Sequence, residues 1–282
     1  MSGAEASDTP AATRLDLLPG YACRRFGDPS RPPSTLLLHG FTSSGADWAS
    51  WPANAPAALA PDLPGHGASP APASDFRSEI QRLLAALPTT IDRLAGYSLG
   101  GRIALSLLAA APERFGAATI MAAHPGLINA GQREARRAAD AHWVALLREQ
   151  GIDAFVDTWE RQPLFASQAA LPAQVIAKQR RRRLAQRADG LAASLACFGL
   201  AEMPGTWEAL VRWPGRLCWL AGARDGKFAA IAERIARERP RTDVRIIPGA
   251  GHNLLLEAPC AALAAALETG GAAPRLQPRK SS

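Results

Sequence analysis

Residues 96–100 are Gly-Tyr-Ser-Leu-Gly, and this Gly-x-Ser-x-Gly pattern is typical of a turn that exposes a nucleophilic serine. The pattern lies between an apolar run at residues 93–95 and a helix-forming run at 102–111. Glycine at both ends allows a sharp turn from strand to helix, because a Cβ there would collide with the neighbouring chain. We predict that Ser98 is exposed at the C-terminal edge of a sheet, with the N–H of Leu99 facing the same space.

A pattern of five residues recurs by chance, so the prediction depends on partners elsewhere in the chain. Residues 217–221 predict a buried strand, and the turn after it presents Asp225. Residues 244–247 predict the next strand, which is followed by His252. The order Ser, Asp, His is the order of one known kind of catalytic triad. We therefore predict that Asp225 orients His252 and that His252 polarises Ser98.

An upstream strand supplies a candidate oxyanion hole. Residues 35–38 predict a buried strand that ends in His39-Gly40-Phe41. The N–H groups of Phe41 and Leu99 would then form two donors for a developing oxyanion. His39 and His66 do not follow a late strand, so we expect them to form hydrogen bonds within their loops rather than to do chemistry.

Strands alternate with helical stretches along much of the chain, which predicts an α/β fold with a mostly parallel sheet and helices on both faces. The strand patterns vanish between His124 and about Pro214. Helices broken at Gly151, Pro163, Pro172 and Pro204 take their place and indicate an inserted helical cap. We predict a core of residues 14–124 and 211–269, a cap of residues 125–210, and disordered ends at 1–13 and 270–282.

The chain has 282 residues and a formal net charge of +7, which raises the question of an anionic partner. Arginines are concentrated in the predicted cap, including a run at residues 180–183. No aromatic interleaving or nucleic-acid-binding motif accompanies them, so we predict no nucleic acid partner. Most of these arginines are expected on a solvated face, whereas Arg102 follows the serine turn and could bind a carboxylate.

Other features of composition favour a cytoplasmic protein. No apolar run approaches the roughly 20 residues that cross a bilayer, and residues 1–10 lack the basic and apolar regions of a secretory signal. The four cysteines lack metal-type spacing and are expected to be reduced and mostly buried. We expect no membrane insertion, and a monomer or weak oligomer.

Ten short segments together resemble one family. They are Leu-His-Gly-Phe at 38–41, Asp-Trp at 47–48, Asp-Leu-Pro-Gly-His-Gly at 62–67, Gly-Tyr-Ser-Leu-Gly-Gly-Arg at 96–102, His-Pro-Gly-Leu at 124–127, Glu-Ala-Arg at 134–136, Trp159, Pro-Leu-Phe at 163–165, Asp-Gly-Lys-Phe at 225–228 and Gly-His-Asn at 251–253. The chain resembles the 2-succinyl-6-hydroxy-2,4-cyclohexadiene-1-carboxylate synthases, which are α/β-hydrolase-fold lyases of menaquinone biosynthesis. The segment at 62–67 is shared by many relatives and discriminates little.

The resemblance implies an α/β-hydrolase fold, a Ser98-Asp225-His252 triad, and an elimination of pyruvate from a cyclohexene that carries three carboxylates. It implies no metal and no organic cofactor. The carboxylate ligands that it implies are Arg102, Arg136 and Arg183, and the residues lining the pocket are Tyr97 and Trp159. Residues 198–204 depart from the Gly-Thr-Gly-x-Gln-Pro segment of many members, so the resemblance does not extend to that part of the pocket.

Two other classes of function fit the same residues. A serine esterase, thioesterase or C–C bond hydrolase could use the same triad on the same scaffold. A binding protein that has lost catalysis could also keep the fold, although the intact Ser98, Asp225 and His252 argue against it. A serine at position 98 disfavours dehalogenase or epoxide-hydrolase chemistry, which uses an aspartate there.

Overall fold

The computed structural model describes residues 14–268, so the predictions made for residues 1–13 and 270–282 lie outside the described residues. Within it, eight strands form one sheet in the order β1-β2-β4-β3-β5-β6-β7-β8. They are β1 (Arg14–Leu18), β2 (Tyr21–Phe26), β3 (Thr35–Leu38), β4 (Ala58–Pro61), β5 (Arg93–Tyr97), β6 (Ala117–Met121), β7 (Arg216–Gly222) and β8 (Asp243–Ile247). Strand β2 is antiparallel to both of its neighbours, whereas β4, β3 and β5 to β8 pair in parallel. The predicted α/β class with a mostly parallel sheet is confirmed.

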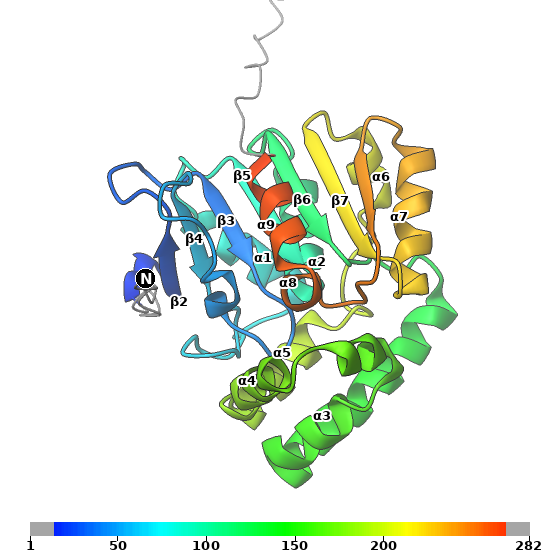
Figure 1. The fold of residues 1–282 in the computed structure, drawn as a ribbon. Helices are drawn as coiled ribbons and strands as arrows, with labels where there is room; N and C mark the ends of the chain where they lie inside the picture. Colours follow the sequence, from blue (N-terminus) through cyan, green and yellow to red (C-terminus); the bar gives the residue numbers. More distant parts are fainter. Residues whose placement is uncertain (1–13, 269–282) are drawn as a thin grey trace, which may run out of the picture.

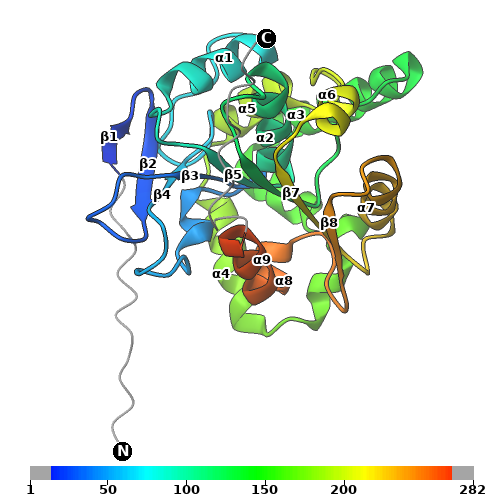
Figure 2. The same ribbon diagram turned by 90° about the horizontal axis from the view of Figure 1, so that it is seen from above.

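Helices cover both faces of the sheet (Figure 2). One face packs against α1 (Phe76–Ala86), α2 (Leu99–Ala110), α6 (Trp207–Arg212) and α7 (Gly226–Glu238). The other face packs against η1 (Gly45–Trp48), α8 (Leu254–Glu257) and α9 (Pro259–Glu268). Strand β3 shows the consequence, since all of Thr35–Leu38 is buried: Leu36 and Leu38 belong to one core and Leu37 to the other.

Four elements between β6 and α6 form a separate helical layer, which we call the cap. They are α3 (Ala130–Trp159), η2 (Pro163–Ala170), α4 (Ala173–Leu184) and α5 (Ala188–Phe198). Helices α3, α4 and α5 lie together at one end of the sheet (Figure 1). The cap has an apolar core of its own, in which Leu147 and Phe155 of α3 pack with Leu191 of α5.

Breaks in the cap coincide with glycine and proline. Gly151 has φ 80° and interrupts α3, Pro163 begins η2, and Pro172 is the N-cap of α4. At the neck of the insertion the carbonyl of Pro125 accepts hydrogen bonds from both the N–H (2.7 Å) and the hydroxyl (2.9 Å) of Thr206. Helix α6 begins inside the range 125–210, but its Trp207 and Leu210 pack in the core of the sheet. The structure thus places α6 with the sheet rather than with the cap.

The cysteines are less buried than expected. Cys23 and Cys218 are buried in strands, Cys197 is half-buried and Cys260 is exposed, and all four are free thiols. Burial raises the pKa of the Cys23 and Cys218 thiols to about 12, which keeps them protonated at neutral pH. Within residues 14–268, no helix has both the length and the apolar character needed to cross a membrane.

Candidate active site

The turn from β5 to α2 exposes Ser98. Ser98 has φ 50° and ψ −107°, a conformation rare for a residue with a side chain. A Cβ on Gly100 would overlap the carbonyl of Leu38, so only glycine allows α2 to approach the end of β3 this closely. Leu99 is the first residue of α2, and the first N–H groups of a helix have no partner within the helix. Its N–H is therefore available beside the serine hydroxyl.

The structure brings Ser98, His252 and Asp225 into one hydrogen-bonded line. His252 Nδ1 lies 2.7 Å from Asp225 Oδ2, and His252 Nε2 lies 3.0 Å from Ser98 Oγ. Since a carboxylate can only accept, Nδ1–H donates to Asp225, which leaves the Nε2 lone pair to accept the serine hydroxyl. Asp225 and His252 are 7% and 3% exposed, so little water competes for these bonds. The arrangement can transfer a proton from Ser98 to His252.

His39 and His66 form the loop hydrogen bonds expected of them. His39 Nε2 accepts the N–H of Leu63 at 2.8 Å, and His66 Nε2 accepts the N–H of Thr42 at 3.3 Å. Burial lowers the pKa of His39 to about 4 and that of His66 to about 3, so both are neutral at pH 7. Together they fix the loop that contains Phe41, the second predicted oxyanion donor.

Glu257 supports the His252 loop, a role that the sequence analysis missed. Its Oε2 accepts the N–H of Gly251 at 2.7 Å, and its Oε1 accepts the N–H of Asn253 at 3.0 Å. One carboxylate thus binds the backbone on both sides of His252. The only sequence signal was an acidic residue five positions after the histidine, which is too common to identify such a role.

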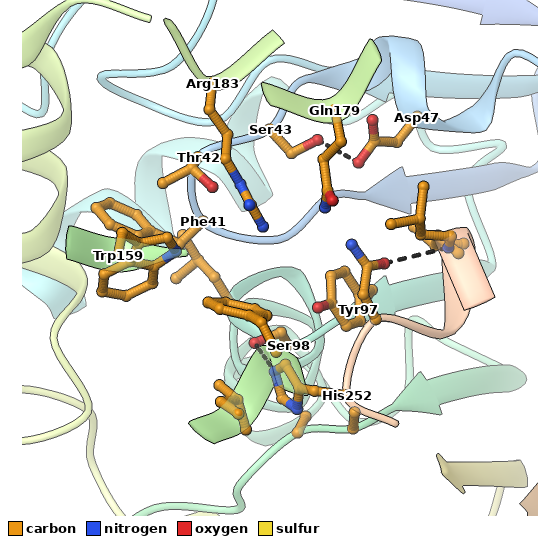
Figure 3. Close-up of a pocket in the computed structure, with 18 of the residues that line it drawn as sticks. Phe41, Thr42, Ser43, Asp47, Tyr97, Ser98, Trp159, Gln179, Arg183 and His252 are labelled. Carbon is orange, nitrogen blue, oxygen red and sulfur yellow. Dashed lines mark hydrogen bonds between the residues drawn. The ribbon is translucent and has the colours of Figure 1, made fainter. Parts of the chain in front are cut away.

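One cavity of about 640 Å³ joins the triad to the cap. Ser98 and His252 lie on its core side, and residues of the cap close it from the other (Figure 3). All five residues predicted to bind substrate line it: Tyr97, Arg102, Arg136, Trp159 and Arg183. Phe41 and Leu99 also line the cavity, so the predicted site residues are brought together except for Asp225, which is behind His252.

Arg183 is the buried member of the arginine run. Its guanidinium points into the cavity (Figure 3), where Nη1 lies 2.9 Å from Glu160 Oε1 and the charge stacks 4.9 Å from the ring centre of Phe165. The preceding arginine, Arg182, pairs with Asp47 of the core at 3.1 Å. Arg181 is exposed. The structure thus distinguishes the four consecutive arginines, whose register the sequence left open: Arg183 is buried in the cavity wall, and Arg182 also lines the cavity while paired with Asp47.

Arg102 and Arg136 form a second cationic end of the cavity. Arg102 Nη1 donates to the carbonyl of Phe198 at 2.6 Å, and Arg136 binds Asp140 through Nε (2.9 Å) and Nη2 (2.6 Å). Burial, and then the nearby charge of Arg136, lower the pKa of Arg102 to about 10, so it remains charged at pH 7. Each guanidinium keeps further N–H groups for a ligand.

Two residues at this end had no assigned role. Lys227 and His124 line the cavity beside Arg102. Burial, followed by the charges of Lys227 and Arg102, lowers the pKa of His124 to about 4, so His124 is a neutral group among cations. Both residues fall in segments that supported the family resemblance, which was the one available signal.

Aromatic rings form the remaining wall. Trp159 stacks on Phe155 with ring centres 5.2 Å apart and meets Phe41 edge to face at 5.4 Å. Tyr97 and Phe228 flank His252, with ring centres 5.5 and 4.6 Å from the imidazole. Burial raises the pKa of Tyr97 well above its usual value, so its phenol is neutral.

The fold and this serine site define a known class of protein. The model of the alpha/beta hydrolase family matches residues 35–266, and the chain belongs to this family.

Within that family the chain is similar to 2-succinyl-6-hydroxy-2,4-cyclohexadiene-1-carboxylate synthases, as the motifs predicted. It is 33% identical to the synthase of Salmonella typhimurium, over 82% of this chain and 92% of that protein. It is 32% identical to that of Escherichia coli O1:K1 / APEC, over 86% of this chain and 96% of that protein. The structure of MenH from S. aureus aligns with a TM-score of 0.81 at 27% identity, over 88% of this chain and 97% of that one.

Proposed function

We propose that this protein eliminates pyruvate from 2-succinyl-5-enolpyruvyl-6-hydroxy-3-cyclohexene-1-carboxylate and forms 2-succinyl-6-hydroxy-2,4-cyclohexadiene-1-carboxylate, a reaction of menaquinone biosynthesis. The observation that supports it most is the single cavity in which Ser98 and His252 face Arg102, Arg136 and Arg183. A substrate with three carboxylates matches several separate guanidinium groups, whereas a neutral ester offers no carboxylate to the N–H groups that remain beyond their protein partners. The similarity to synthases of that name supports the same substrate.

In the proposed reaction the Ser98–His252 pair is the base. Ser98 Oγ takes the ring proton α to the succinyl ketone while its own proton moves to His252 Nε2 along the 3.0 Å hydrogen bond. The C–H electron pair first forms an enolate with the succinyl ketone. When the enolate collapses, this pair makes a new ring double bond, the existing double bond moves by one position, and the C–O bond to the enolpyruvyl group breaks. His252 then returns a proton to the departing enolate, which leaves as pyruvate.

The neighbouring residues stabilise this step. The N–H groups of Phe41 and Leu99 bind the ketone oxygen as it becomes an enolate. Asp225, 2.7 Å from His252 Nδ1, stabilises the imidazolium that forms. Arg102, Arg136 and Arg183 hold the carboxylates, and Tyr97 and Trp159 enclose the ring.

The alternative is a hydrolase that uses Ser98 as a nucleophile, because the same triad could form an acyl-enzyme. The two reactions differ in whether water is consumed. Hydrolysis adds one water across the broken bond and passes through a covalent Ser98 adduct, whereas elimination does neither. The charged cavity favours elimination over an esterase of neutral substrates.

The test is to incubate the purified protein with the enolpyruvyl precursor in heavy-oxygen water. We expect pyruvate and a ring product that has the mass of the diene, without solvent oxygen, and no adduct on Ser98 in the intact protein. Pyruvate exchanges its ketone oxygen with water, so the ring product is the one to weigh. Solvent oxygen in that product, or an acylated Ser98 peptide, would overturn the proposal in favour of the hydrolase.

A further inference from the structure

The side-chain amide of Asn253 uses its oxygen in a hydrogen bond, whereas its NH₂ group has no partner among the described residues. It lies between His252 and α8, and its Oδ1 accepts the N–H of Leu256 at 3.2 Å as the N-cap of that short helix. A backbone N–H can only donate, so the oxygen must face Leu256 and the amide NH₂ must face away from it. The orientation of the amide is therefore set by the capping hydrogen bond.

The NH₂ group is directed to the substrate cavity. Asn253 is 7% exposed and lines the same cavity as Ser98 and Tyr97. Within residues 14–268, no acceptor forms a hydrogen bond with Nδ2, whereas Oδ1 and the backbone N–H both have partners. Nδ2 is not among the fully buried side-chain atoms that lack a partner in the described residues, so it is open to the cavity, where an acceptor of the ligand can take the place of water.

The cavity that Asn253 lines contains neutral polar groups as well as charged ones, Arg183 and Asp47 among them. Tyr97 and Gln179 both line it and point into the same region (Figure 3), and the phenol of Tyr97 is neutral. The arginines that we assign to carboxylates come from α2, α3 and α4, whereas Asn253 comes from the loop after β8. The amide can thus donate a hydrogen bond to an oxygen of the ligand from the side opposite the cap.

We propose that Asn253 is a specificity-determining residue that donates a hydrogen bond from Nδ2 to an oxygen of the bound polyoxygenated substrate, while its Oδ1 caps α8. This inference rests on the proposed function, since the substrate is the one named there. The same residue then has two separable roles, one in stability and one in binding.

Substitutions can separate the two roles. Asn253→Ser keeps a capping oxygen without an amide donor and adds no charge. We expect it to raise KM about threefold to tenfold with kcat changed less than about twofold. Asn253→Asp also keeps the cap but points a carboxylate at the substrate, so we expect a KM increase of about tenfold or more. Urea-unfolding midpoints of both variants should match that of the unmodified protein.

Asn129 provides the matched control. It caps α3 by accepting the N–H of Gln132 at 3.0 Å, but it is exposed and outside the cavity. Asn129→Ser and Asn129→Asp should leave KM unchanged. An Asn253→Ser protein with an unchanged KM in the pyruvate-release assay would overturn the inference.

A binding measurement distinguishes this inference from the proposed function. Calorimetry with the enolpyruvyl precursor compares Ser98→Ala with the double variant Ser98→Ala/Asn253→Ser, neither of which needs turnover. Weaker binding by the double variant supports the role of Asn253 even if no pyruvate is released, and equal binding overturns it. Absence of both turnover and binding in the unmodified protein would overturn both proposals.

Discussion

The core side and the cap side of the cavity are built differently. On the core side, backbone geometry places the groups: the strained Ser98, the glycine at 100 and the loops after β3, β7 and β8 leave little freedom. On the cap side, long side chains reach inward and are held by acidic partners, as Arg183 is by Glu160. The first arrangement suits chemistry that needs fixed distances, and the second suits recognition of several charges. The difference predicts separate kinetic effects of changes on the two sides.

The largest effect is expected on the core side. Ser98→Ala, Asp225→Asn and His252→Ala should each lower kcat by about 100-fold or more, because each removes a part of one proton-transfer unit. KM should change little and circular dichroism should show an intact fold. A well-folded Ser98→Ala protein with a normal pyruvate-release rate would exclude the serine from the mechanism.

Acid should lower the stability of the folded protein through the buried histidines on the core side of the cavity. The pKa values of His39 and His66 in the folded chain, about 4 and about 3, lie below the ordinary value of 6.5. Between these folded-state values and pH 6.5, the unfolded chain therefore binds more protons than the folded chain. The histidines thus contribute their full share to the free energy of unfolding above about pH 7, and this contribution falls as the pH drops through 6.5. We expect the free energy of unfolding in urea to fall by about 2–4 kcal/mol between pH 7 and pH 5.

The control for acid is His142, which is exposed. His142→Gln should keep the full pH dependence, whereas His66→Asn should reduce its slope. The same free energy of unfolding at pH 7 and pH 5 would show that the neutral histidines do not hold the oxyanion loop in this way.

On the cap side, Arg183→Ala should cost about 1.5–3 kcal/mol in kcat/KM, the range for a charged hydrogen bond. Arg136→Ala in the cap, and Arg102→Ala on α2 of the core, should behave similarly, and lysine should restore only part because it lacks the planar fork. Steady-state pyruvate release measures each effect, which should fall mainly on KM. Arg181, exposed on the same helix, is the matched control, and Arg181→Ala should be nearly silent. Equal losses of kcat/KM in Arg181→Ala and Arg183→Ala would show that the cap arginines form a solvated face and do not bind the substrate.

The same contrast explains what the sequence could predict. The positions of Ser98, Asp225 and His252 follow from strand order and glycine placement, which are local patterns. The pairing of Arg182 with Asp47 joins residues far apart in the chain, and only the packing of α4 decides which arginine faces inward. The sequence pattern predicts residues 207–210 as part of the cap, because a helical pattern does not show which surface a helix covers. Long-range packing, rather than local propensity, determined these outcomes.

Glu257 offers the smallest and most specific test of the core side. Its two oxygens accept N–H groups on both sides of His252, and glutamine offers one acceptor while its NH₂ would face the other N–H. One buried N–H then lacks a partner and the His252 loop shifts, so Glu257→Gln should lower kcat about tenfold with KM nearly unchanged. Glu257→Asp keeps both acceptors and should recover part of the rate. Glu208→Gln, which removes an exposed acid paired with Arg212, should have no effect. A purely structural role for Glu257 would lower the unfolding midpoint without this separation of kcat from KM, and an unchanged kcat would show that backbone support at this loop does not position His252.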